Sequence, residues 1–276
     1  MKEVVKIHVP MDIKNIVLVG AGNVATHFGM ALCKAGYVVK QVYSRTGLSA
    51  AELAGRLGCG FTTSVTGILP DADAYIVSIK DSALGEVLPE LVKRNPDALY
   101  VHTAGSVPMD VWKGLADRYG VLYPMQTFSK QRPVDFSVVP FFVEASGPGE
   151  LETLKQMGVR MGGKVYEATS GQRRYLHIAA VFACNFANHM HAVAEHLLEK
   201  NGLPFEVMLP LIDETARKAH VLSPVEGQTG PARRYDENVI GSHLDMLADE
   251  PELAEIYRLV SRNIHEYATR KEEDEV

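Results

Sequence analysis

Short runs of apolar residues alternate with amphipathic stretches over the first two-thirds of the chain. A short Ile/Val/Leu run bounded by polar or Gly positions is typical of a strand buried on both faces of a parallel sheet. A stretch whose apolar residues recur every three to four positions is typical of a helix. The runs predict strands at 16–19, 38–43, 74–79, 99–102, 121–123, 140–145 and 164–167. The amphipathic stretches predict helices at 24–35, 49–57, 83–93 and 150–161.

This alternation predicts βαβ units and therefore a parallel, doubly wound α/β sheet of the Rossmann type. The pattern changes near Ser170, after which strand-like runs disappear. No Gly or Pro interrupts Gln172 to Lys200, so a long helix is predicted there, ending at Asn201-Gly202. Further helices are expected at 204–222, 243–248 and 251–268. We therefore expect an α/β domain at 12–169 and an all-α domain at 170–276.

Composition narrows the class of protein. The chain has 276 residues, 46% of them hydrophobic and 22% charged, so it can bury a core and most of it is not disordered. A net charge of -6 leaves no basic surplus for nucleic acid or an anionic membrane surface. Cys33, Cys59 and Cys184 form no CxxC pair, which argues against a disulfide framework and structural zinc. Without a signal segment or a long apolar run, we expect a cytoplasmic protein with no membrane span.

A glycine-rich motif follows the first predicted strand and opens the first predicted helix. It reads Gly20-Ala21-Gly22-Asn23-Val24-Ala25, the pattern GxGxxA. In this position Gly20 would make a tight turn, and Gly22 would let the backbone approach a pyrophosphate. The free N–H groups of the helix start favour an anion, so Gly20, Gly22, Asn23 and Val24 are predicted to cradle a dinucleotide. The alternative is a plain glycine turn.

The end of the second predicted strand bears on the choice between NAD and NADP. An Asp or Glu there would bind a ribose 2′-hydroxyl, whereas this chain reads Tyr43-Ser44-Arg45-Thr46 and has no carboxylate before Glu52. The planar guanidinium of Arg45 suits a 2′-phosphate, and Ser44 and Thr46 add hydroxyl donors. These residues predict NADP as cofactor, and the alternative is an arginine on a surface loop.

Polar residues also follow later strands of the predicted sheet. Ser78 follows the third of the strong apolar runs, Thr103 follows the fourth, and Gln126 follows the strand near 121–123. The carboxyl ends of parallel strands meet at the edge where a dinucleotide crosses. Ser78 and Thr103 are therefore predicted at the nicotinamide end and Gln126 near a substrate; simple loops with a helix cap are the alternative.

The long predicted helix begins with a group of cationic residues. Arg173 and His177 are four residues apart and Arg174 and His177 three apart, so each pair shares a helix face. His177 could act as a general acid, or it could be a packed or capping histidine. Arg173 or Arg174 could hold a substrate carboxylate. Asn185 lies two turns after His177, and its hydrogen-bond partner could be substrate or helix backbone.

Three histidines further along this helix do not predict a metal site. His189 and His191 are two residues apart and point away from each other on a helix, and His196 is two turns from His189. No HExxH motif or carboxylate cluster supports them, so we expect no metal.

Together these segments resemble one group of proteins. The resemblance rests on Gly20–Ala25, Tyr43–Thr46, His102–Gly105, Tyr123–Phe128, Tyr175–Asn185 and Thr229–Pro231, and covers roughly residues 13 to 268. The chain resembles a Rossmann-like NADP oxidoreductase family with a helical domain of unknown function. That family is related to pyrroline-5-carboxylate reductase, ketopantoate reductase, the β-hydroxyacid dehydrogenases and the deazaflavin-dependent NADP reductases. The resemblance implies a C-terminal domain like that of 6-phosphogluconate dehydrogenase, a homodimer formed through it, and an active site between the domains.

One departure from the related families leaves two hypotheses. The β-hydroxyacid dehydrogenases and ketopantoate reductases carry a catalytic lysine on the long helix, and no lysine lies between Gln172 and Glu199 here. The first hypothesis is an NADPH-dependent reductase of a carbonyl or imine in a small carboxylate-bearing metabolite, with His177 as proton donor. The second is a non-catalytic, dimeric NADP-binding sensor or scaffold.

Overall fold

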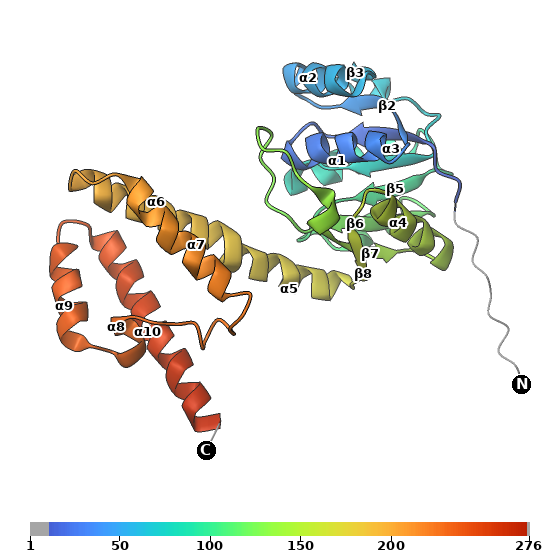
Figure 1. The fold of residues 1–276 in the computed structure, drawn as a ribbon. Coiled ribbons are helices and arrows are strands. Elements are labelled where there is room, and N and C mark those ends of the chain that lie inside the picture. The colour runs from blue at the N-terminus through green and yellow to red at the C-terminus, as the bar shows by residue number, and fades with distance from the viewer. Residues whose placement is uncertain (1–10, 275–276) are drawn as a thin grey trace, which may run out of the picture. The chain divides into compact units, whose positions relative to one another are not determined.

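The computed structural model of the chain describes residues 11–274. It divides into two compact units, Met1–Asn185 and Phe186–Val276. The first unit contains all the strands of the described residues, and only helices follow the last strand (Figure 1). The last strand ends at Glu167 and the next helix begins at Ser170, whereas the compact units divide later, after Asn185.

The first unit is built on a single sheet whose strands run in the order β3-β2-β1-β4-β5-β6-β7-β8. Its central strands are almost entirely Val, Ile, Leu and Tyr, and they are buried on both faces. The strands are β1 Asn15–Val19, β2 Val38–Tyr43, β3 Gly60–Thr62, β4 Ala74–Val77, β5 Leu99–His102, β6 Tyr119–Pro124, β7 Pro140–Ala145 and β8 Lys164–Glu167. Each predicted strand is present, and the short edge strand β3 is additional.

The alternation of strands and helices predicts a wholly parallel sheet, and this prediction is wrong for one pair of strands. β6 and β7 pair antiparallel, with Leu122 opposite Val143, while every other neighbouring pair in the sheet is parallel. A parallel pair needs a crossover, usually a helix. The link from β6 to β7 has only a short 3-10 turn at Phe136–Val138, so the chain turns back beside β6.

Helices cover both faces of the sheet, as a doubly wound fold requires. The helices are α1 Asn23–Lys34, α2 Gly47–Leu57, α3 Leu84–Val92 and α4 Pro148–Arg160. Ile16 and Leu18 of β1 belong to one buried cluster, with residues of α1, α2 and α4. Val17 and Val19 belong to another, with α3 and the ring of Trp112. Successive side chains of β1 point to opposite faces of the sheet, so this one strand contributes to the buried cluster on each face.

Strand register brings the ends of the parallel strands together. Val19 at the end of β1 is level with Tyr43 of β2 and with Val77 of β4. Val77 is in turn level with His102 of β5. The residues that follow these strands therefore lie along one edge of the sheet, which is where a doubly wound fold places its ligand.

The helical part begins with the long segment that the sequence predicts. It consists of α5 Ser170–Ala180, a π-helical stretch Val181–Phe186 and α6 Ala187–Lys200. A capping box at Thr169 and Gln172 starts α5. The π-helical stretch is a departure, because it changes the angular spacing of side chains from that of a regular helix.

The second unit continues with further helices. They are α7 Leu209–Lys218, α8 Pro231–Arg234, α9 Glu237–Met246 and α10 Pro251–Asp274. The predicted helix at 204–222 is shorter than expected and is preceded by a 3-10 turn, Phe205–Met208. Lys200 at the end of α6 contacts Asp249 at 2.6 Å and Glu250 at 2.8 Å, just before α10. Within the residues described, no helix is both long enough and apolar enough to cross a membrane.

Candidate active site

The glycine turn between β1 and α1 has the geometry that the motif predicts. Gly20 has φ +129°, and a Cβ there would collide with the Ser78 carbonyl at the end of β4. Only glycine fits this position, both for its backbone angle and for this close approach. Gly22 is the N-cap of α1, and no atom lies within 4 Å of where its Cβ would be. The backbone at Gly22 is thus open to a neighbouring group.

A cleft of about 250 Å³ adjoins this turn. Gly20 and Gly22 line one part of it, and Ser44, Arg45 and Thr46 line another. Lys80, just after β4, adds a second cation, and no Asp or Glu lines the cleft. Among the described residues, neither Arg45 nor Lys80 has a carboxylate partner within ion-pair distance. The cleft is therefore positively charged and suits the phosphates of a dinucleotide.

The other residues predicted for the cofactor lie at the same sheet edge. Ser78 lines the cleft, and its hydroxyl is 2.7 Å from the hydroxyl of Thr103. The amide of Asn23 donates to the carbonyl of Phe128 at 2.9 Å, so its side chain holds a loop and does not face the cleft. Val24 is half-buried in the first turn of α1. The predicted cradle would thus be formed by glycine backbone, while Asn23 fixes the loop after β6.

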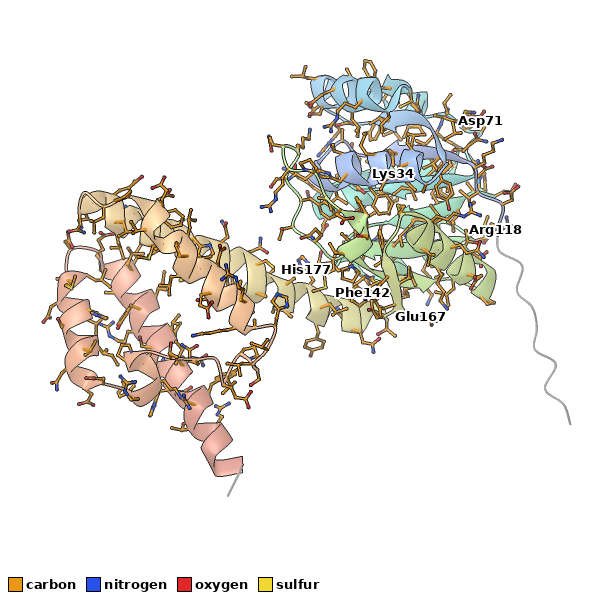
Figure 2. The ribbon with its side chains drawn as sticks, viewed as in Figure 1. Lys34, Asp71, Arg118, Phe142, Glu167 and His177 are labelled. Carbon is orange, nitrogen blue, oxygen red and sulfur yellow. The ribbon has the colours of Figure 1, made fainter. Side chains whose placement is uncertain are left out.

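A pair of proton-bearing groups lies next to the residues that follow β5. The hydroxyl of Tyr123, on β6, is 3.5 Å from Nδ1 of His177, on α5, and the two rings meet edge to face. His177 is labelled in Figure 2. Gly105 makes room for both, because a Cβ there would lie 3.0 Å from His177 Nδ1 and 3.0 Å from the Tyr123 hydroxyl. Burial raises the pKa of Tyr123, an effect that the Arg173 guanidinium partly offsets. The phenol therefore keeps its proton at neutral pH.

Arg173 does not hold a substrate, and that prediction is corrected. Its side chain is fully buried, and it donates to Glu144 at 2.6 Å and to the Val107 carbonyl at 2.7 Å. Burial tends to raise the pKa of Glu144, but hydrogen bonds from Ser170 and Arg173 outweigh it and hold this pKa below its usual value. Arg173 is a structural residue that fixes α5 to β7, and its guanidinium is not available to a ligand.

The remaining predicted site residues are exposed. Arg174, next to Arg173, is exposed and has no carboxylate partner among the described side chains. Gln126 is exposed, and its side-chain Oε1 accepts a hydrogen bond from the backbone N–H of Thr127 at 2.8 Å. Asn185 is exposed and belongs to the π-helical stretch, so its angle from His177 is not that of a regular helix. The roles of these three residues toward a substrate stay predictions.

Sequence reasoning missed two site residues. Lys80 and Tyr123 stand in segments that were recognised as strand exits, but neither was singled out. Their position at the carboxyl edge of the sheet was the available signal. Of the histidines of α6, His196 contacts Glu250 at 2.9 Å. In the part of the chain that the structure describes, no group of His, Cys, Asp or Glu could hold a metal ion.

Two family models match the chain. Residues 15–105 match the family model described as "NADP oxidoreductase coenzyme F420-dependent". Residues 139–264 match a domain of unknown function, DUF2520. The first model covers the glycine turn and strands β1 to β5. The second begins just before β7 and continues into the helical part.

A solved structure decides the family. The crystal structure of a putative NADP oxidoreductase from Bacteroides fragilis is 56% identical and superposes with a TM-score of 0.89, covering 92% of this chain and 98% of that one. The chain belongs to this NADP oxidoreductase family. Two more distant likenesses show the fold alone. A protein from Thermotoga maritima (20% identity, TM-score 0.69) covers 93% of this chain and 99% of that one. A pyrroline-5-carboxylate reductase from Coxiella burnetii (18%, 0.58) covers 94% and 98%.

Membership of the NADP oxidoreductase family gives a fold and a class of reaction. It does not define a substrate. None of the curated proteins matches this chain. The glycine turn, the cationic cleft and the Tyr123–His177 pair are therefore the basis for any statement about its chemistry.

Proposed function

We propose that the chain is an NADPH-dependent reductase of a carbonyl or imine carbon in a small, carboxylate-bearing metabolite. The observation that carries this proposal is the continuity of one sheet edge. The cationic cleft leads through the Ser78–Thr103 hydrogen bond to the residues after β5, where Gly105 adjoins Tyr123 and His177. NADPH supplies a hydride when bound, and the protein supplies position and a proton.

The charges of the cleft favour NADPH over NADH. Arg45, flanked by Ser44 and Thr46, would hold the ribose 2′-phosphate, with Lys80 as a second cation. A dehydrogenase that selects NAD uses a carboxylate for the 2′-hydroxyl, and none lines this cleft. The backbone at Gly20 and Gly22 would face the pyrophosphate.

His177 is the proposed proton donor to the developing oxygen or nitrogen anion. Tyr123 orients its ring through the contact between the hydroxyl and Nδ1, leaving Nε2 to face a substrate. Arg174 replaces Arg173 as the proposed partner of the substrate carboxylate, because it is exposed and shares a helix face with His177. Gln126 and Asn185 would then bind polar atoms of the substrate.

Turnover tests this assignment. The loss of NADPH absorbance is followed with 2-oxo acids, 3-oxo acids, cyclic imines and an oxidised deazaflavin. His177→Ala should lower kcat about a hundredfold or more, the usual scale of general-acid catalysis, with unchanged NADPH affinity. His220→Ala, which removes an exposed histidine of the second unit, is the matched control and should behave as the wild type. Undiminished turnover in His177→Ala would overturn the role of His177.

The alternative is a non-catalytic NADP-binding sensor or scaffold. The sequence feature in its favour is the absence of lysine between Gln172 and Glu199. NADPH binding without turnover across the whole panel would favour this alternative. Any substrate-dependent oxidation of NADPH that His177→Ala abolishes would exclude it.

A homodimer formed through the helical unit is part of the same proposal. Within residues 186–270, only Ala232, Ile240, Leu247 and Ser261 are buried. Leu211 and Leu259 are 62% and 56% exposed, and a helical unit with so few buried residues can bury such side chains against a second copy of the chain. Light scattering should therefore give twice the 30.3 kDa chain mass. Leu211→Glu should lower that mass, whereas Val159→Glu, on α4 of the first unit, should not; a monomeric wild type would contradict the proposal.

A further inference from the structure

A second and larger cleft lies within the first unit. It has a volume of about 660 Å³, within the range of small-molecule sites. One face of α1, the loop at 130–137 and the end of α4 form it, and it shares no lining residue with the cleft at the glycine turn. Lys34, which lines it, marks the position of its α1 wall in Figure 2. We call it the basic cleft.

Its charge is opposite to that of the whole chain. Lys34, Arg56, Lys130 and Arg160 line the basic cleft, and Asp135 is the one carboxylate among the lining residues. Asp135 already accepts from the backbone N–H of Ser137 at 2.9 Å. In a chain with a net charge of -6, this is a local excess of positive charge that attracts anions.

The cations of the basic cleft have few carboxylate partners, and the guanidinium of Arg160 lies over the Tyr37 ring, 5.8 Å from its centre. Lys130 has its nearest carboxylate oxygen, on Glu52, at 3.9 Å. Among the described side chains, Lys34, Arg56 and Arg160 have no carboxylate within 4.0 Å. A cationic surface that only served solubility would be interspersed with acidic groups. The guanidinium groups of Arg56 and Arg160 are suited to bidentate contact with phosphate or carboxylate.

The wall of the basic cleft is held in place and partly apolar. His27, on α1, stacks on Phe128 at 5.6 Å, and its Nε2 is 2.8 Å from the Ser129 carbonyl oxygen, which ties the loop to α1. The side chains of Met30, Phe136 and Met161 contribute apolar surface. An occupant can therefore bury a carbon skeleton while its charged groups meet the cations.

We propose that the basic cleft is a second ligand site, for an organic anion with at least two negative charges on a small carbon skeleton. The charges come from phosphate or carboxylate groups, which share the same recognition chemistry. Its occupant is distinct from the nicotinamide cofactor, because the two clefts have no lining residue in common.

Calorimetric titration of the full chain tests this proposal, with citrate and tripolyphosphate as probes. Arg56→Ala and Arg160→Ala should each weaken binding about tenfold, and binding should fall as salt is raised. Arg132→Ala is the matched control, since it removes the same charge from the loop that forms one wall of the cleft, and Arg132 itself does not line the cleft. Arg45→Ala distinguishes the two clefts and should leave the affinity of the basic cleft unchanged. Trp112 fluorescence verifies that each variant is folded.

Three results would overturn the proposal. No measurable binding of either probe at millimolar concentration would do so. So would equal weakening in Arg132→Ala, which would indicate a nonspecific charge effect. Loss of binding in Arg45→Ala alone would place the anion in the cleft at the glycine turn. Binding of citrate but not tripolyphosphate, or the reverse, would support the site and identify its preferred anion.

Discussion

The role of Arg173 can be tested by removing its charge. Arg173→Met keeps most of the side-chain length and removes the bonds to Glu144 at 2.6 Å, to Val107 O at 2.7 Å and to Ser170 at 3.3 Å. Glu144 then stays in its place without a cation, and its side chain is only 20% exposed. A structural role predicts a large loss of stability, whereas a substrate-binding role predicts a loss of substrate affinity in a stable protein.

The expected loss follows from the burial of the pair. Breaking a buried ion pair by removing one partner costs about 3–5 kcal/mol. We expect the lower end of this range, because the Glu144 side chain is 20% exposed and can be partly hydrated. For a unit of this size, about 3 kcal/mol lowers the midpoint of thermal unfolding by about 6–12 °C.

The single tryptophan gives a direct assay. Trp112 is fully buried in the first unit, and its ring lies 6.4 Å from that of His102. Its fluorescence therefore follows the unfolding of the unit that contains Arg173. Arg174→Met, the exposed neighbour, is the control and should change the midpoint by less than about 2 °C. Equal midpoints for Arg173→Met and Arg174→Met would refute the structural assignment.

Three further predictions concern the same unit. Because the pKa of Glu144 is lowered in the folded chain, its contribution to stability is present above about pH 4.5 and is lost as the pH falls through its folded value. The stability difference between wild type and Glu144→Gln should therefore shrink below that pH; a constant difference would contradict the assignment. Gly20→Ala should abolish dinucleotide binding measured by titration, while Gly22→Ala should weaken it less; the reverse order would contradict the geometry. Burial raises the pKa of Cys59 to about 11, so Cys59 should react with an alkylating reagent more slowly than exposed Cys33, which peptide mapping would show or refute.

Local signals were enough to predict the cofactor cleft. The strand, the glycine turn and the helix are adjacent in sequence, and the residues Ser44 to Thr46 follow a strand that pairs directly with β1. Parallel pairing places the ends of such strands at one edge, so the cleft follows from strand order alone. The same reasoning predicts that Ser78 and Thr103 lie at this edge, and their hydroxyls are 2.7 Å apart there.

Other features depended on contacts that spacing cannot reveal. Arg173 pairs with Glu144, which lies 29 residues earlier on β7. This buried ion pair leaves the guanidinium of Arg173 unavailable to a substrate, and no local spacing predicts it. The π-helical stretch gives Asn185 an angular position relative to His177 that differs from that of a regular helix. The antiparallel β6–β7 pair followed from a connection without a helix, where alternation had predicted a parallel sheet throughout. Tyr123 contacts His177 because β6 and α5 lie next to each other. The sequence gives no sign of this contact between residues 54 positions apart.

The central claim is that the cleft at the glycine turn binds NADPH through Arg45. Fluorescence titration of NADPH and NADH against the wild type and Arg45→Ala tests it most directly, with Arg132→Ala as a control of equal charge. We predict that the wild type binds NADPH more tightly than NADH. We further predict that Arg45→Ala weakens NADPH binding by tenfold or more, with little effect on NADH. Equal weakening of both nucleotides, or no preference in the wild type, would contradict the account.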